Sequence, residues 1–324
     1  MEFLDTILFG AFLGKPGWAW LAFAGLVLAL LAFDLGVLHR KDRAIEVGES
    51  VWLSAGYIAV ALAFGGWVWW RFGEDSGIEY LTGFLIEKSL AMDNVFVIAT
   101  IFAYFAIPRH LQHRVLFWGI LGVIVLRAVM IGAGAALVAE IDWILYVFGA
   151  FLLATGVKML VAGGDPPPVE DNPVLRALRR WMNVTPALEG NRFFVRRIDP
   201  GTGRAVRHAT PLFLALVLIE VADVIFAVDS VPAIFAITTD PFIVYTSNIF
   251  AILGLRALYF ALAAAVHRFH YLKYALALVL VFVGAKIFLV GIVGKLPPAL
   301  SLGVTLGLLA GGIAWSLWKT RKEA

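Results

Sequence analysis

The chain has 324 residues, of which 61% are hydrophobic and 15% are charged, and its formal net charge is +3. Soluble proteins carry about 25% charged residues, so this composition indicates a bundle of membrane helices. There is no cysteine, which excludes disulfides, thiolate metal sites and thiol catalysis. The sequence shows neither a phosphate-binding loop nor a large soluble domain for ATP hydrolysis, and we predict that the protein is not an enzyme.

A helix that crosses a bilayer needs roughly 20 mostly apolar residues. Nine stretches meet this requirement: 17–38, 50–70, 79–106, 114–138, 141–163, 211–237, 242–266, 271–293 and 298–318. The sequence therefore predicts an all-α polytopic membrane protein with about nine transmembrane helices.

The connections between these spans alternate in charge. The basic ones are 39–43, 109–114, 164–210, 267–273 and the tail 319–323, and the acidic ones are 73–77, 139–142 and 238–241. Cytoplasmic loops carry the excess of lysine and arginine. The alternation therefore predicts an N-terminus outside the cell and a cytoplasmic C-terminus.

The long connection 164–210 contains eight arginines and begins with three consecutive prolines, which cannot continue a helix. Its stretch "NPVLRALRRWMN" (172–183) reads as a short basic amphipathic segment. Two interpretations stay open: a loop that faces anionic lipid, and a loop that regulates the protein or binds a partner.

Two acidic stretches repeat one another within the apolar chain. "EKSLAMDNV" (87–95) aligns without gaps on "DVIFAVDSV" (223–231). Further landmarks recur in the same order, and the matched pairs are Glu87 with Asp223, Asp93 with Asp229, Asn94 with Ser230, Arg127 with Arg256, and Lys158 with Lys286. This order indicates an internal duplication.

Each repeat contains three spans, so the second enters the membrane from the opposite side. Such inverted repeats are typical of secondary transporters, whose sites lie near the midplane where the repeats meet. The predicted organisation is 1–78 with two peripheral spans, 79–163 as the first repeat, 164–210 as a cytoplasmic loop, 211–293 as the second repeat, and 294–324 as a last span with a basic tail.

The acids of the two repeats are the candidate site. They are Glu87, Asp93, Glu220, Asp223 and Asp229. A charge at the bilayer centre costs at least about 2.5–3.5 kcal/mol, so basic groups, protons or cations must neutralise them. Carboxylate, amide, hydroxyl and carbonyl oxygens suit Mg²⁺, Ca²⁺ and Mn²⁺, and all six histidines fall in loops or at span ends.

Asp223 and Asp229 lie six residues apart, which places them about 120° apart on a straight helix. Pro232 cannot donate to the carbonyl of Val228. We therefore predict that this helix is irregular just before Pro232, so that both acids reach one point.

The competing interpretation is a set of internal ion pairs. Arg127 and Arg256 fall within spans and are available to the acids, whereas Lys158 and Lys286 lie nearer span ends, where long side chains reach toward the interface. Asp34 is either an end-of-helix charge or a further ligand. These five residues are the candidates for ion pairing or gating.

The two acidic motifs and "FDLGVLHRKDR" (33–43) resemble the TerC family of integral membrane proteins, named for tellurium resistance, over residues 20–318. The length and the nine spans resemble the Alx-like branch. The resemblance implies a bacterial inner-membrane protein of the LysE-like transporter superfamily that exports divalent cations, manganese foremost. It also implies a metal site formed by the five acids, with Asn94 and Ser230 as accessory ligands.

Manganese would be a transported substrate rather than a permanent cofactor, and the expected partners are the metal ion and the bilayer, without nucleic acid. Two alternatives stay open. One is a membrane scaffold or assembly protein whose acids form structural ion pairs. The other is a calcium or proton-coupled cation transporter, since the same oxygen ligands bind calcium.

Overall fold

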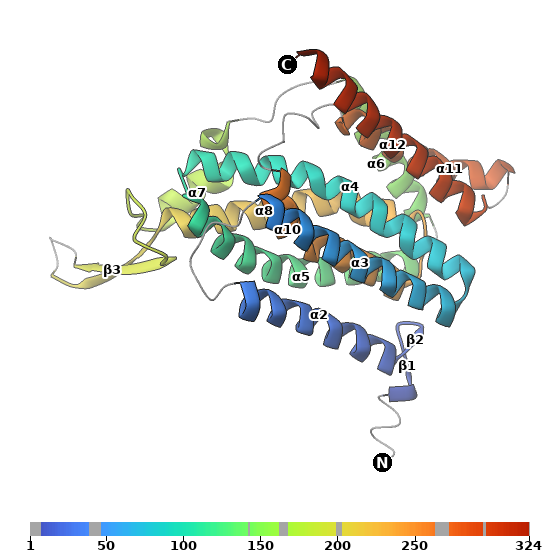
Figure 1. Cartoon of the computed structure of the whole chain (residues 1–324), viewed down its shortest axis with the longest axis horizontal. Helices are drawn as coiled ribbons and strands as arrows, with labels where there is room; N and C mark the ends of the chain where they lie inside the picture. Colours follow the sequence, from blue (N-terminus) through green and yellow to red (C-terminus); the bar gives the residue numbers. More distant parts are fainter. Residues whose placement is uncertain are drawn as a thin grey trace.

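A computed structural model describes residues 8–38, 47–141, 143–161, 168–198, 203–262, 272–293 and 296–323. Long helices dominate these residues, and they run side by side (Figure 1). The helices are α2 (Gly17–Leu38), α3 (Val47–Phe72), α4 (Glu74–Tyr104), α5 (Arg109–Glu140), α6 (Ile144–Val161), α7 (Pro173–Trp181), α8 (Pro211–Phe235), α9 (Pro241–Leu253), α10 (Leu255–Leu262), α11 (Leu272–Val293) and α12 (Pro298–Glu323), with the short 3₁₀ helix η1 (Val169–Asp171).

Two small antiparallel hairpins complete the described structure. One pairs β1 (Ala11–Phe12) with β2 (Lys15–Pro16), and the other pairs β3 (Phe194–Ile198) with β4 (Ala205–Ala209). The β3–β4 hairpin projects beyond one end of the helices, at the left of Figure 1. The architecture is therefore an all-α polytopic membrane protein with almost no sheet.

Eight helical segments in the described residues are long and apolar enough to cross a membrane: α2, α3, α5, α6, α8, α9 with α10, α11 and α12. Helix α4 has 31 residues but carries Glu87, Lys88 and Asp93 within its apolar stretch. It packs among the other helices, against α3, α8, α9 and α12. Eight of the nine predicted spans thus correspond to one long helix each. The span 242–266 corresponds to α9 followed by α10, and its last residues lie outside the described residues.

Each helix of the first predicted repeat packs against a helix of the second. Helix α4 packs against α9 as α8 packs against α5, and α6 packs against α11. Helices α4 and α8, which carry the two acidic motifs, also pack against one another. This pattern is the one expected of two interlocked three-helix repeats, whose boundaries stay a prediction.

The predicted irregularity before Pro232 is wrong. Helix α8 runs without interruption from Pro211 to Phe235, and the amide of Ala236 donates to the carbonyl of Pro232 at 3.0 Å. Proline removes only one amide donor, and membrane helices tolerate this loss when they are packed among others. Since the helix continues, Asp223 and Asp229 face different neighbours.

An irregularity occurs instead between α9 and α10, at Gly254. A Cβ atom there would lie 2.8 Å from Nζ of Lys88 and 3.2 Å from Cβ of Tyr57. Lys88 donates to the carbonyl of Ala251 at 3.1 Å. A cation close to the last carbonyls of a helix interacts favourably with its dipole, and the missing side chain at Gly254 leaves room for it.

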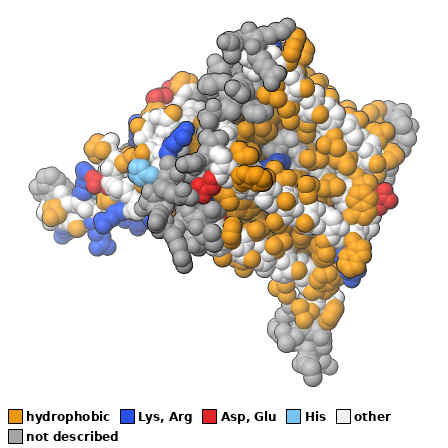
Figure 2. All heavy atoms as spheres, viewed as in Figure 1, with side chains coloured by type: hydrophobic (Ala, Val, Ile, Leu, Met, Phe, Trp, Pro, Cys, Tyr) orange, Lys and Arg blue, Asp and Glu red, His pale blue; other side chains and the backbone are white. Residues whose placement is uncertain are grey.

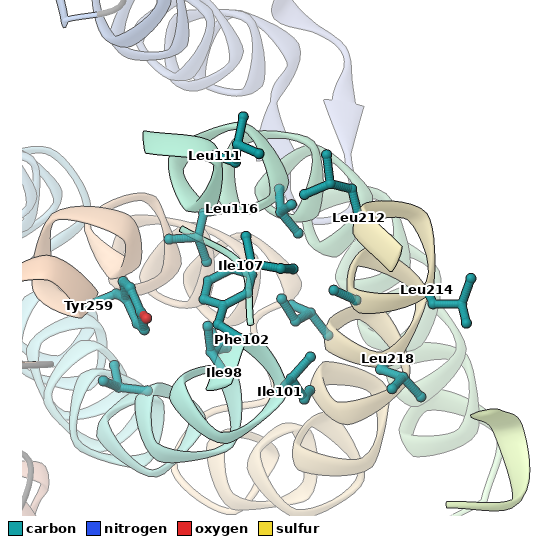
Figure 3. Packing of buried hydrophobic residues seen from close by; sticks show 14 of the residues in the cluster. Ile98, Ile101, Phe102, Ile107, Leu111, Leu116, Leu212, Leu214, Leu218 and Tyr259 are labelled. Carbon is teal, nitrogen blue, oxygen red and sulfur yellow. The ribbon is translucent and has the colours of Figure 1, made fainter. Parts of the chain in front are cut away.

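The described part of the connection 164–210 is folded. Asn172 caps α7 by accepting from the amides of Val174 (2.9 Å) and Leu175 (3.4 Å), and Pro173 occupies the first turn. Leu175 and Ala209 are buried in a cluster with residues of α4, α5, α8 and α10. Figure 3 shows the packing of other members of this cluster. The predicted amphipathic segment is confirmed as α7.

Charged side chains are distributed unevenly over the surface. On the face that Figure 2 shows, apolar side chains cover most of the helical body, while lysine and arginine gather around the β3–β4 hairpin. We call this end of the bundle the basic end.

Helices α6 and α11 approach one another closely at glycines. A Cβ atom on Gly156 would lie 2.8 Å from the carbonyl oxygen of Ala277, and one on Gly284 would lie 2.8 Å from that of Gly149. Small residues that let backbones approach are a common means of helix association in membranes.

Replacing Gly156 with alanine is therefore expected to destabilise the protein by about 1–3 kcal/mol, because backbone atoms must move. The matched control is Gly132→Ala on α5, where a Cβ atom meets nothing within 4 Å; it is expected to stabilise by roughly 0.5–1 kcal/mol. Thermal unfolding in detergent measures both, and equal midpoints for the two variants would contradict the close packing.

Candidate functional site

Arg127 of α5 is the centre of a buried polar network and is 1% exposed. Its Nε and Nη2 atoms contact the two carboxylate oxygens of Asp223 at 3.0 and 3.1 Å. Its Nη1 atom lies 2.9 Å from Oε1 of Glu87. One guanidinium thus joins the matched acids of the two repeats, and its two-pronged contact with Asp223 is among the strong forms of ion pair.

Neutral polar side chains complete this network. Arg127 Nη1 donates to Oγ of Ser230 at 2.6 Å and to Oδ1 of Asn248 at 3.4 Å. Asn248 donates to Glu87 at 3.0 Å, and Asn94 donates to Asp223 at 3.4 Å. Buried charges need such partners on their remaining donors and acceptors.

A cavity of about 50 Å³ adjoins the network, between the two acidic helices. Its lining comprises Glu87, Leu90, Asp93, Asn94, Arg127, Met159, Phe226, Asp229, Ser230 and Leu280. Five of the seven predicted site residues therefore surround one cavity. The other two, Asp223 and Glu220, do not line it.

Asp93 reaches this cavity from α4, and Asp229 reaches it from α8. Asp229 accepts a hydrogen bond from Thr155 of α6 at 3.3 Å. Within the part of the chain that the structure describes, neither aspartate forms an ion pair with a lysine or arginine. The side-chain Oδ1 of Asn94, which also lines the cavity, is buried without a hydrogen-bond partner among those residues.

The side chains of Asp223 and Asp229 point in different directions, as expected on a straight helix. Asp223 contacts Arg127, whereas Asp229 contacts Thr155 and the cavity. Glu220 lies three residues before Asp223 and faces α5 too, since a Cβ atom on Gly122 would overlap its carboxyl group. Its Oε2 is buried without a partner in the described residues.

The second matched arginine has a different role from the first. Arg256 of α10 forms a buried ion pair with Asp34 of α2. This contact ties α2 to α10. Asp34, for which two interpretations were open, is therefore part of a buried ion pair.

The matched lysines also differ. Lys158 is exposed, as expected of a side chain that reaches toward an interface. Lys286 is 9% exposed and lines a cavity of about 690 Å³ with Asp75, Glu79 and Asp240, at the opposite end from α7. Neither lysine lines the cavity between the acidic helices.

The sequence interpretation missed Asn248, Thr155 and Met159, which the structure places in or beside the site. It also missed Lys88, which lies against the interruption at Gly254. Lys88 and Asn248 had a usable signal, because each is a strongly polar residue inside an apolar span. Thr155 and Met159 are ordinary in a membrane helix, and only the packing of α6 brings them to Asp229 and the cavity.

The described residues contain no group of three or more His, Cys, Asp or Glu that is already arranged to hold a metal ion. Arg127 forms ion pairs with Glu87 and Asp223. Asp93 and Asp229 line the cavity, and they have no ion pair among the described residues.

Residues 72–324 match the model of the family described as integral membrane protein TerC family. The chain is also similar to an uncharacterised membrane protein of Myxococcus xanthus, with 50% identity over 95% of this chain and 94% of that protein. A membrane protein of Rickettsia bellii is 47% identical over 91% of this chain and 95% of its own length.

A further relative is the putative membrane-bound redox modulator Alx of Escherichia coli K12, 47% identical over 92% of this chain and 94% of its own. No solved structure matches the chain significantly. The family model covers far more than half of the chain and includes both acidic motifs. The chain therefore belongs to the TerC family of integral membrane proteins.

Proposed function

We propose that this protein exports divalent cations, with Mn²⁺ as its substrate, across a bacterial inner membrane. The cation binds between the two acidic helices. The N-terminus lies outside the cell, and the basic end lies in the cytoplasm, as the excess of arginine at that end favours.

One observation carries this proposal: carboxylates from both repeats line a single small cavity deep among membrane helices. Ionisable groups at such a depth are expensive and mark ion pathways. Asp93 comes from α4 and Asp229 from α8, so a cation between them contacts both repeats. That arrangement suits a transporter in which one repeat moves against the other around a fixed site.

The available ligands favour a hard cation. The cavity offers carboxylates, the unpartnered Oδ1 of Asn94 and the hydroxyl of Ser230, against one thioether from Met159. Oxygen ligands of this kind suit manganese, magnesium and calcium. Calcium is the competing substrate, because it accepts the same ligands in flexible geometry.

The charge balance supports the same conclusion. Five carboxyl groups, from Glu87, Asp93, Glu220, Asp223 and Asp229, lie on the two acidic helices. Among the described residues, Arg127 pairs with Glu87 and Asp223, and Arg256 pairs with Asp34. Asp93, Asp229 and Glu220 have no ion pair in that part of the chain, and a cation is one way to compensate for their charge.

The name of the Escherichia coli relative refers to redox modulation. This chain has no cysteine, so a thiol is not available for redox chemistry. A cation exporter affects redox balance through the metal content of the cell, without itself exchanging electrons.

The second candidate function is a membrane scaffold whose acids are structural. The observation that favours it is the network around Arg127, which joins α4, α5, α8 and α9 through buried contacts. This network accounts for Glu87 and Asp223. It does not account for Asp93 and Asp229, which lie outside it.

Two substitutions in the cavity separate these functions. Asp93→Asn and Asp229→Asn are each expected to raise cellular manganese and abolish tolerance of excess manganese, because each removes a charged ligand and keeps the shape. Membrane insertion is checked in parallel. Wild-type manganese content and tolerance in both variants would contradict the exporter and leave the scaffold.

A further inference from the structure

A second cavity, of about 290 Å³, lies between α4 and α8 beside the basic end. We call it the lateral groove. Val97 and Ile101 of α4 and Leu218, Ala222 and Phe226 of α8 form its walls, and residues 168–173 lie across one end. The lining is apolar except for Thr100 and, at the end, Asp171 and Asn172, so most of the groove suits an apolar occupant.

The groove borders the lipid. Ile225, which lines it, is 60% exposed on the outer surface of a membrane helix. The wall residues of α8 follow one another at spacings of three and four, so they form a single stripe along that helix. A stripe of this kind, parallel to the helix axis, matches the direction of an acyl chain in a bilayer.

The mouth of the groove carries an arginine. Asp171 lines the groove, and Arg176 of α7 donates to its backbone carbonyl at 3.2 Å, which places the guanidinium beside the mouth. Arg180 and Trp181 follow on the same short helix, and Trp181 is 83% exposed. Exposed tryptophan next to arginine is typical of a helix at the level of lipid headgroups.

From this juxtaposition we infer that the lateral groove binds one phospholipid, with an acyl chain between α4 and α8 and the phosphate beside Arg176. The site is separate from the cation cavity, and it does not depend on the proposed transport. Phe226 lines both cavities, so a bound chain lies against a ring that also bounds the acidic site.

Native mass spectrometry of the full-length protein in detergent tests this site. The probes are phosphatidylglycerol and a diacylglycerol with the same acyl chains, which lacks the phosphate. Wild-type protein is expected to retain phosphatidylglycerol roughly 10-fold better, as a hydrogen bond to a charged group implies. Arg176→Gln is expected to remove this preference, and Ala222→Leu, which fills the groove, to reduce retention of both lipids.

Matched controls are Arg204→Gln beside the β3–β4 turn and Ala136→Leu on the exposed face of α5; both are expected to behave as wild type. Arg176→Gln changes an exposed side chain, so it tests the phosphate contact even if Ala222→Leu does not fold. The inference is overturned if wild-type protein retains neither lipid, if it retains both equally, or if a peptide or a second copy of the chain occupies the groove instead.

Discussion

Replacement of Arg127 with methionine is expected to lower the free energy of unfolding by about 3–5 kcal/mol, because it leaves buried carboxylates without their cation. Glu87 is 1% exposed and Asp223 is 5% exposed, and both contact this one guanidinium. The loss is measured by unfolding in detergent or by the yield of folded protein in the membrane.

A combined variant provides the control. Arg127→Met together with Glu87→Gln and Asp223→Asn is expected to recover most of the lost stability, since removing both sides of a buried pair is often nearly neutral. Arg180→Gln, on the exposed surface of α7, is expected to change stability by less than about 0.5 kcal/mol. Equal stability of wild type and the single Arg127 variant would mean that the network does not hold the two repeats together.

Replacement of Met159 with lysine is expected to abolish manganese export while the protein stays folded. Met159 lines the cavity from α6, opposite the acidic helices. Lysine has a similar unbranched stem, and its ammonium group gains Asp93 and Asp229 as partners. The tethered charge occupies the place of the transported cation, and export is expected to fall by at least about 10-fold, the least that a disturbed metal shell usually costs.

Met159→Leu is the matched control, because it keeps the volume and adds no charge; volume-conserving swaps usually cost less than about 1.5 kcal/mol. Export by the leucine variant is expected to stay near wild type. If the lysine variant exports manganese normally, the cavity does not lie on the cation pathway.

The sequence predicted the long helices well because each span must satisfy its own backbone in lipid. Helix α2 has the predicted bounds, and α11 (Leu272–Val293) falls within the predicted span 271–293. The match between Glu87 and Asp223 also held in three dimensions, since both contact Arg127. Two acids at matched positions of the two aligned motifs therefore indicated that both lie at one site.

Other features depended on packing that no local pattern shows. Arg127 and Arg256 are matched in sequence, yet α2 supplies Asp34 to one of them, and that helix lies outside the repeats. Pro232 does not break α8, whereas Gly254 interrupts the helix where Lys88 approaches. A local sequence pattern indicates that a buried charge or a proline is unfavourable, but it does not show which distant residue compensates for it.

The folded connection between the repeats shows the same limit. Its composition suggested a basic loop, and its amphipathic segment was recognisable from "NPVLRALRRWMN". The β3–β4 hairpin was not predicted, because its strands are short and carry arginines. Burial of Leu175 and Ala209 against the membrane helices is what orders this segment.

Manganese flux in proteoliposomes tests the central claim most directly, because no other cellular component is present. Purified wild-type protein is expected to carry Mn²⁺ down an imposed gradient, in competition with Ca²⁺ but not with Na⁺. The double variant Asp93→Asn with Asp229→Asn, equally folded, is expected to show only the background leak of empty vesicles. Equal flux through both proteins, or no flux through wild type, would contradict a cation pathway between α4 and α8.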